Sequence, residues 1–221
     1  MGPLTAGGSA GRRSGRRHLD RHALPQRPSE ISPRQRRPAD RPEGNGLGIR
    51  IIQLAGYDVY YEPSTPHTVE RFGQQLRAGV SLAASAGVIL AFETMETPFM
   101  NTVQKAMAWV TECSSPYLQV YPDIGNLTNG APDVPADLNT GAGHLVAAHL
   151  KETREGVFRD LFYGDGRVDF GVIIPALWAL GVRKYVTEFW AEAGADGQQR
   201  ICAAHDYARS LLSPLATVAN R

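Results

Sequence analysis

The chain has 221 residues, of which 43% are hydrophobic, so it is long enough to form one sizeable core. Its formal net charge is +1, and this balance gives no overall field that would favour nucleic acid or a membrane surface as the partner. No run approaches the roughly 18 consecutive apolar residues of a membrane-spanning helix, and no apolar signal-peptide core stands at the N-terminus.

Residues 1–48 differ in composition from the rest of the chain. Positions 1–50 contain eleven arginines, no lysine and four acids, and the first aromatic residue is Tyr57. Such a stretch cannot bury enough apolar surface to offset its ordering entropy, so residues 1–48 are expected to be disordered or foreign to the fold. An arginine-rich run can also bind nucleic acid. We do not expect that here, because the run offers neither stacking aromatic residues nor a recognition fold.

From Ile49 to Arg221, apolar runs of strand length alternate with segments of helical periodicity. The pattern predicts strands at residues 49–56, 87–93, 117–121, 145–150 and 184–189. It predicts helices over residues 68–86, 102–112, 137–143, 170–180 and 198–212. This alternation indicates a parallel sheet covered by helices. The predicted fold class is therefore α/β of the (β/α)8 TIM-barrel type, with residues 49–221 forming one partial barrel.

Four consecutive strands of this pattern lead into an ionisable residue: Glu93, Asp123, His149 and Glu188. One such acid is usually a helix cap or an ion-pair partner, and a lone histidine is usually a core residue. Four in the same phase are expected to converge, because the C-terminal strand ends of a barrel meet at one face. Three carboxylates at that place would repel one another unless a cation neutralised them. Mixed carboxylate and imidazole ligands suit Mn²⁺ or Zn²⁺, so one divalent ion is expected.

Six motifs also stand in order along the chain, at residues 51–61, 99–102, 121–127, 149–152, 164–170 and 188–190. Together they resemble the L-ribulose-5-phosphate 3-epimerases, also called L-xylulose-5-phosphate 3-epimerases, of the xylose-isomerase-like barrels. The resemblance runs from about residue 48 to the end of the chain. It implies the same four metal ligands that the spacing indicates.

The resemblance further implies an isomerase that moves a proton at C3 of a ketopentose phosphate, with Glu93 and Glu188 as the acid/base pair. Substrate contacts are expected from Arg159, Asn126 and Lys151. Each has a plainer alternative, namely an ion pair of Arg159 with a nearby aspartate, a turn position for Asn126 and an ion pair for Lys151. Trp190 is expected to pack rather than to line the pocket.

The expected setting of this enzyme is the cytoplasm. Cys113 and Cys202 cannot form a disulfide framework, and both are predicted to be buried, reduced thiols. The expected partner is a small sugar phosphate rather than a membrane, and the resemblance allows a homodimer.

The chain departs from the resembled family before Ile49, where a complete member has three more strand–helix units. About five of eight strands are therefore expected, and these cannot close a barrel. The arginine-rich stretch in their place suggests a truncated or frame-shifted product, or else a disordered extension on a shortened domain. Open alternatives for function are a 3-epimerase or an aldose–ketose isomerase of a related sugar, or an inactive product. A metal-dependent endonuclease is disfavoured, because only one histidine stands at a strand end.

Overall fold

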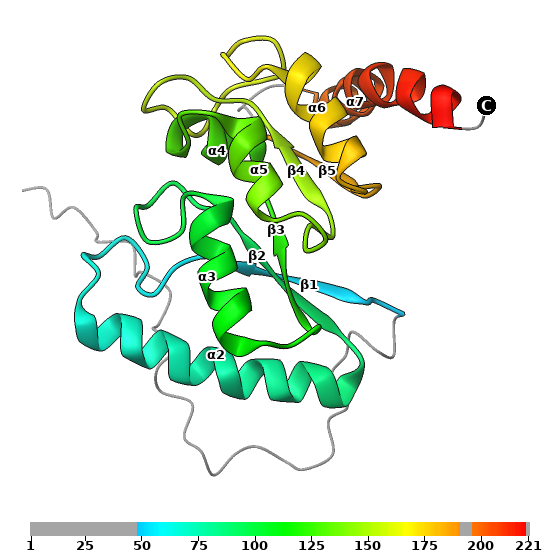
Figure 1. Ribbon diagram of the computed structural model, residues 1–221. Helices are drawn as coiled ribbons and strands as arrows, with labels where there is room; N and C mark the ends of the chain where they lie inside the picture. The colour runs from blue at the N-terminus through cyan, green and yellow to red at the C-terminus, as the bar shows by residue number, and fades with distance from the viewer. Residues whose placement is uncertain (1–47, 191–195, 220–221) are drawn as a thin grey trace, which may run out of the picture. The chain divides into compact units, whose positions relative to one another are not determined.

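The computed structural model describes residues 48–190 and 196–219, and residues 1–47, which make up nearly all of the segment predicted to be disordered, lie outside this range (Figure 1). The described residues form strands and helices in alternation. The strands are β1 (Ile51–Ala55), β2 (Ile89–Glu93), β3 (Leu118–Tyr121), β4 (Ala148–Lys151) and β5 (Tyr185–Glu188). The helices are α2 (Pro66–Ala86), α3 (Val103–Cys113), α4 (Ile124–Gly130), α5 (Val134–Thr140), α6 (Phe170–Ala179) and α7 (Gly197–Ala219).

All pairings between the described strands are parallel. Strands β1, β2 and β3 form one sheet in that order, and β4 pairs with β5. Isolated bridges from Val120 to Leu145 and from Asp123 to His149 connect β3 with the segment that contains β4. The described strands do not close into a barrel. The predicted α/β fold of TIM-barrel type, with five strands and an open edge, is confirmed.

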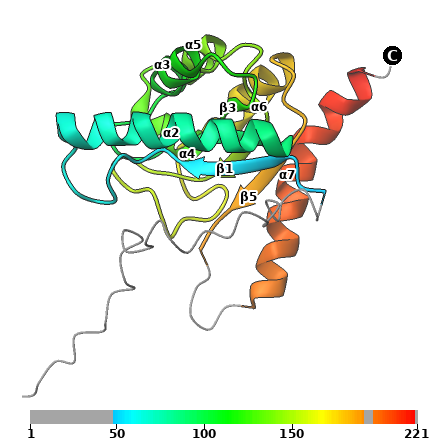
Figure 2. The ribbon, with the colours of Figure 1, turned by 90° about the horizontal axis from the view of Figure 1, so that it is seen from below.

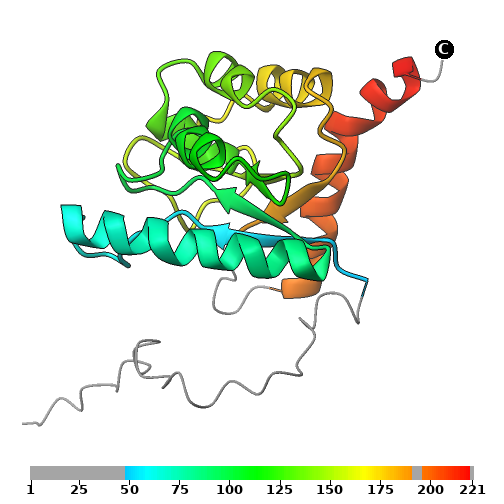
Figure 3. The same ribbon diagram turned by 60° about the horizontal axis from the view of Figure 1, so that its bottom comes forward.

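The two faces of these strands have different environments. The outward face packs on the helices, and its largest fully buried side chains include Phe92, Leu118 and Leu150. Helix α3 packs on β3, α4 on β4 and α7 on β5. Figures 2 and 3 show α2 running alongside β1 while α7 lies beside β5. The inward face carries a small cluster of Ala91, Tyr121 and Ala147, and the polar site residues follow it at the strand ends.

Local capping explains where the helices begin, including two that the sequence pattern misplaced or missed. Helix α5 begins at Val134 rather than Asp137, because the side chain of Asp133 accepts a hydrogen bond from the Ala136 amide at 3.0 Å. Helix α4 was not predicted as a helix. It begins after Asp123, whose side chain caps it by accepting from the Asn126 amide at 2.7 Å.

The fourth strand is shorter than predicted. Only Ala148–Lys151 pairs as a strand, whereas the prediction began at Leu145. Before Ala148 the segment bonds only to β3, with the Val146 amide donating to the Val120 carbonyl at 3.1 Å; from Ala148 it also pairs with β5 while His149 still donates to the Pro122 carbonyl. The contacts with the β3 side are isolated bridges, so only the residues paired with β5 form a continuous strand.

The two cysteines are both free thiols. Cys113 is half-buried, but Cys202 is exposed on α7, so the prediction of burial is wrong for Cys202. In the described part of the chain, no helix is both long and apolar enough to cross a membrane.

Candidate metal centre

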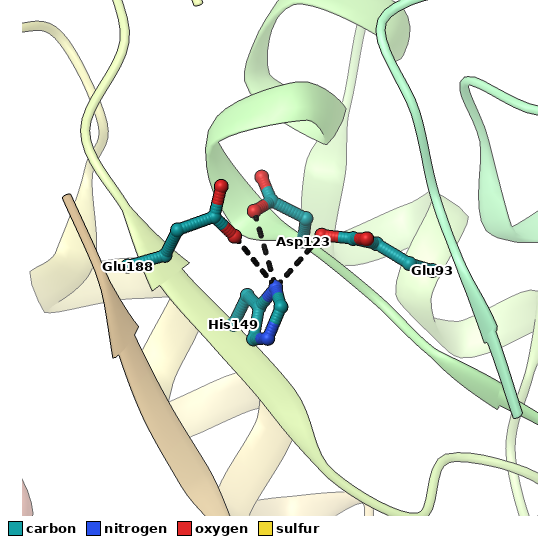
Figure 4. Close-up of side chains that lie close together, drawn as sticks. All are labelled: Glu93, Asp123, His149 and Glu188. Carbon is teal, nitrogen blue, oxygen red and sulfur yellow. Dashed lines mark hydrogen bonds and ion pairs between the residues drawn. The ribbon is translucent and has the colours of Figure 1, made fainter. Parts of the chain in front are cut away.

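The four predicted ligand residues converge at the C-terminal ends of the strands. One ligand atom from each of Glu93, Asp123, His149 and Glu188 can be chosen so that all four lie within 4.8 Å of one another. Figure 4 shows Glu188 and Glu93 approaching the His149 ring from opposite sides, with Asp123 between them. The Nδ1 atom of His149 lies 2.7 Å from Oε1 of Glu93 and 2.7 Å from Oε2 of Glu188. Its distance to Oδ2 of Asp123 is 3.8 Å.

Two of the carboxylates are fixed by their own elements. Glu93 is the last residue of β2 and is only 6% exposed, and its second oxygen accepts a hydrogen bond from the side-chain amide of Gln53 on β1. Asp123 is fully buried and caps α4 with Oδ1. The hydroxyl of Thr94, the residue after β2, holds the backbone of Asp123 by accepting from its amide at 3.0 Å. The ends of β2 and β3 are therefore locked to each other beside the cluster.

The other two ligands belong to the paired strands β4 and β5. His149 is held by its amide, which donates to the Pro122 carbonyl at 2.9 Å, and by an edge-on contact with the Tyr121 ring at 4.8 Å between centroids. Glu188 ends β5 and pairs in register with Lys151 on β4. The ammonium of Lys151 lies 3.4 Å from Oδ2 of Asp123 and 3.6 Å from Oε1 of Glu188.

Crowding of acids shifts the pKa values of the cluster. Burial raises the pKa of Asp123 to about 7, against the opposing charge of Lys151. Burial alone would lower the pKa of His149, but its hydrogen bonds to Glu188 and Glu93 outweigh burial and raise that pKa to about 9. Burial raises the pKa of Glu188, yet the hydrogen bond to His149 and the charge of Lys151 lower it on balance. The three carboxylates of the cluster therefore favour a positively charged group at their centre.

The donor set fits a divalent cation. Oδ2 of Asp123 is buried and has no hydrogen-bond partner in the described part of the chain, although it faces the same point as the other three ligands. The Lys151 ammonium lies 3.4 Å from this oxygen as an ion pair but makes no hydrogen bond to it. A buried carboxylate oxygen without a hydrogen bond costs free energy unless a closer cation or donor reaches it. Three carboxylates and one imidazole are ligands that Zn²⁺ and Mn²⁺ accept. The cluster is therefore a candidate site for one divalent ion.

A cavity of about 290 Å³ opens beside this cluster. Lys151, Arg159 and Trp190, together with three of the four candidate ligands, line it. The prediction that Trp190 only packs is therefore wrong, because its ring forms part of the wall and lies 5.7 Å from both the Lys151 ammonium and the Arg159 guanidinium. Arg159 does not pair with a neighbouring aspartate but lies 3.4 Å from Oε1 of Glu96.

Asn126 occupies a different position from the other predicted substrate contacts. It is fully buried, it does not line the cavity, and its side-chain amide donates to the Thr94 carbonyl at 2.8 Å. Its role as a substrate ligand stays a prediction. The contacts shown are those of a residue that holds the ends of β2 and β3 together.

Sequence reasoning missed several residues that line the cavity, notably Gln53, Met95, Glu96 and Phe158. Gln53 is the one polar side chain within β1, a signal that could have marked it. Glu96 accepts hydrogen bonds from the hydroxyls of Tyr57 at 2.6 Å and Tyr61 at 2.5 Å. No local pattern predicts these bonds, because they join residues that are 35 or more positions apart.

The fold and this site define a class of protein. Residues 44–210 match the family described as "Xylose isomerase-like TIM barrel", and the chain belongs to that family.

Curated relatives narrow the comparison. The chain is 40% identical over 173 residues to the L-ribulose-5-phosphate 3-epimerase UlaE of Shigella sonnei, a match that covers 78% of this chain and 61% of that protein. An enzyme of the same name from Escherichia coli is 39% identical over the same length. The chain therefore spans about three fifths of the length of these relatives.

Solved structures share the fold at low identity. The structure titled L-ribulose 3-epimerase is 20% identical with a TM-score of 0.66, covering 80% of this chain and 66% of that one. D-psicose 3-epimerase from Clostridium cellulolyticum H10 is 20% identical with a TM-score of 0.63, covering 76% of this chain and 66% of that one. At such identities the likeness supports the barrel fold alone.

Proposed function

We propose that this chain carries the catalytic half of a metal-dependent sugar-phosphate 3-epimerase that interconverts L-ribulose 5-phosphate and L-xylulose 5-phosphate. One observation carries the proposal. Two glutamates, Glu93 from β2 and Glu188 from β5, lie on opposite sides of the candidate metal site, and both line the same cavity. Inversion at a carbon next to a carbonyl needs a base on one side of the substrate plane and an acid on the other. The two glutamates fill those positions.

The proton transfer follows from this placement. One glutamate removes the C3 proton, which leaves an enediolate across C2 and C3, and the opposite glutamate then returns a proton to the other face of C3. Which one acts first depends on the direction of the reaction. His149 contacts both glutamates, but only Glu93 is also bonded to Gln53, and its side chain is 8% exposed against 26% for Glu188. A divalent cation, when bound, would supply charge stabilisation to the substrate oxygens next to C3.

The remaining cavity residues have supporting roles in this proposal. Lys151 is only 5% exposed and directs its ammonium toward the cluster, where it can donate to a substrate oxygen. Arg159 is about half exposed at the rim and can meet an anionic or hydroxyl group of the sugar phosphate. Asn126 is the weakest member of the predicted substrate set, since its amide is already bonded to Thr94.

The substrate class rests on the curated relatives, which are named as L-ribulose-5-phosphate 3-epimerases. A cavity of about 290 Å³ suits a small ligand such as a pentose phosphate better than a larger one. A cytoplasmic setting and a homodimer remain predictions, as does the choice between Zn²⁺ and Mn²⁺.

The test is C3 proton exchange in D₂O, followed by proton NMR on L-ribulose 5-phosphate, with the metal content of the same sample measured. The wild-type chain should exchange C3 and form L-xylulose 5-phosphate. Glu93→Gln and Glu188→Gln should each slow exchange by about 10²- to 10⁴-fold. Glu70→Gln on the exposed part of α2 makes the same chemical change away from the cavity and should leave the rate unchanged.

The position of the label separates the alternatives. Deuterium at C1 or C2 in place of C3 would identify an aldose–ketose isomerase and end the proposal. Equal exchange on unphosphorylated L-ribulose would remove the phosphate from the assigned substrate. A folded chain that binds no metal and exchanges no proton would mean that the described residues do not suffice for the reaction.

A further inference from the structure

A second buried carboxylate, that of Glu152, lies one residue beyond β4. It is only 3% exposed, and neither the proton transfer nor the metal cluster uses it. Its Oε1 accepts from the backbone amides of Thr153 at 3.0 Å and Val168 at 3.1 Å, and its Oε2 accepts from the amide of Gly164 at 3.1 Å. All three donors are backbone N–H groups.

These bonds close a loop. Residues 153–169 join β4 to α6, and we refer to them as the β4–α6 loop. Glu152 immediately precedes the loop, and its carboxylate accepts from the amides of Gly164 and Val168 near the end of the loop. The Arg167 amide reinforces the closure by donating to the Thr153 carbonyl at 2.8 Å. The side chain of Glu152 therefore holds the two ends of the loop together.

The closure is so tight that residue 166 must be a glycine. A Cβ at Gly166 would lie 2.2 Å from Oε1 of Glu152 and 2.3 Å from the Thr153 carbonyl oxygen. No side chain fits at these distances unless the backbone moves. The carboxylate thus occupies a space formed by the loop backbone itself.

The middle of the same loop reaches the candidate active site. Phe158 and Arg159 line the cavity, and the Arg159 guanidinium lies 5.5 Å from the Tyr61 ring centroid and 5.7 Å from that of Trp190. The loop positions Arg159 there from a base that is fixed to β4, the strand that also carries His149 and Lys151. A shift of the loop base would therefore move Arg159 relative to the cluster.

A carboxylate suits this place better than an amide. An ionised carboxylate only accepts hydrogen bonds, and three donors converge on it. A glutamine could keep the two bonds to Oε1, but it would turn an NH₂ group toward the Gly164 amide, where donor meets donor. We infer that Glu152 is a positioning residue: it fixes the β4–α6 loop so that Arg159 faces the cavity, and it thereby sets substrate affinity rather than the rate of proton transfer.

This inference rests on the proposed function for its kinetic readout. Glu152→Gln should raise KM by about tenfold and change kcat by less than about threefold, because a misplaced contact weakens binding while both glutamates stay in place. Glu155→Gln, the same change at an exposed position of the same loop, should leave both constants unchanged. Binding of Mn²⁺ to the metal-free protein should be unaffected in both variants.

A double-variant cycle separates positioning from general damage. If Glu152 acts through Arg159, the pair Glu152→Gln and Arg159→Ala should be no worse than Arg159→Ala alone. Losses that multiply would overturn the inference, as would an unchanged KM in Glu152→Gln. If Glu152→Gln does not fold, Glu152→Asp can be used instead. It keeps the carboxylate and should raise KM by a smaller factor.

Hydrogen exchange of the backbone amides gives a readout that is independent of catalysis. The peptide spanning residues 153–169 should lose protection in Glu152→Gln, while β1 to α3 keep theirs. A wild-type chain without C3 exchange would refute the proposed function. The positioning role of Glu152 would then be tested by the amide protection of residues 153–169 alone. Unchanged protection in Glu152→Gln would overturn the positioning role in either case.

Discussion

Asp123 and Glu152 are both buried carboxylates close to the ends of neighbouring strands, with exposed fractions of 0% and 3%. Both oxygens of Glu152 accept backbone hydrogen bonds. Asp123 has one oxygen bonded to the Asn126 amide, and its other oxygen has no hydrogen-bond partner in the described residues. A carboxylate whose acceptors are all filled stabilises the chain that surrounds it. One that keeps a buried oxygen without a hydrogen bond, with the Lys151 ammonium 3.4 Å away, can still take a ligand that the chain does not supply.

The largest difference should appear in the stability of the metal-free protein. Glu152→Ala leaves three backbone amides without their acceptor, and each unpaired buried group costs about 1–3 kcal/mol, so a loss of about 4 kcal/mol in unfolding free energy is expected. Asp123→Asn should cost less, since asparagine is also a good helix cap and Glu188 still faces the Lys151 ammonium at 3.6 Å. Urea denaturation in the presence of a chelator measures both. Equal losses in the two variants would abolish the distinction.

The stability gained on adding metal should rank the two sites in the opposite order. At a Mn²⁺ concentration about 100 times Kd, the wild-type chain should gain about 2.7 kcal/mol in unfolding free energy. Asp123→Asn removes one candidate ligand, so at the same concentration a gain of only about 0.4 kcal/mol is expected if the affinity falls about 100-fold. Glu152→Gln should keep the full gain. The midpoints of urea denaturation, with and without Mn²⁺, provide the measurement.

The sequence predicted the convergence of Glu93, Asp123, His149 and Glu188 because each stands in the same phase at a strand end. Parallel strands bring such positions to one face of the sheet. Strand alternation is a short-range regularity, and it survived the errors in strand length, such as the misplaced start of β4. A site built from the ends of regular elements is therefore visible in the sequence.

The role of Glu152 was not visible in the same way. Its donors are the amide of the next residue and amides 12 and 16 residues further on, in a loop that has no periodicity. Backbone amides carry no residue identity, so no pattern of side chains marks them. The same holds for Gln53 and Glu96, whose partners lie 35 or more residues away. Helix α4 was missed because its seven residues include two glycines and two asparagines, which are poor helix formers.

Asp123 and the neighbouring His149 should also make the stability of the metal-free protein depend on pH. Burial raises the pKa of Asp123 to about 7, so the stability that its proton contributes is present below about pH 4 and is lost as the pH rises through 7. Despite its burial, the hydrogen bonds of His149 to Glu188 and Glu93 raise its pKa to about 9, so its contribution is present below about pH 6.5 and is lost as the pH rises through 9. The metal-free protein should therefore lose stability steadily as the pH rises from 5 to 9.

Variants show which residue causes the dependence of stability on pH. Asp123→Asn should flatten the part between pH 5 and 7, and saturating Mn²⁺ should flatten the whole range, because the cation replaces the bound protons. Glu188 works in the opposite direction, since its lowered pKa adds a loss of stability only as the pH falls below about 4.5. A slope between pH 5 and 7 that persists in Asp123→Asn would show that the proton-linked group is misassigned.

The smallest expected effect concerns an exposed contact within the β4–α6 loop. Arg154 donates from Nε to the Asp165 carbonyl at 2.6 Å, but the residue is exposed to solvent, so water can replace its partner. Arg154→Ala should reduce the unfolding free energy by less than about 1 kcal/mol and change KM by less than about twofold. Urea denaturation and initial rates measure the two quantities. If Arg154→Ala matched Glu152→Gln in KM, any disturbance of the loop would suffice, and burial of the carboxylate would no longer explain its importance.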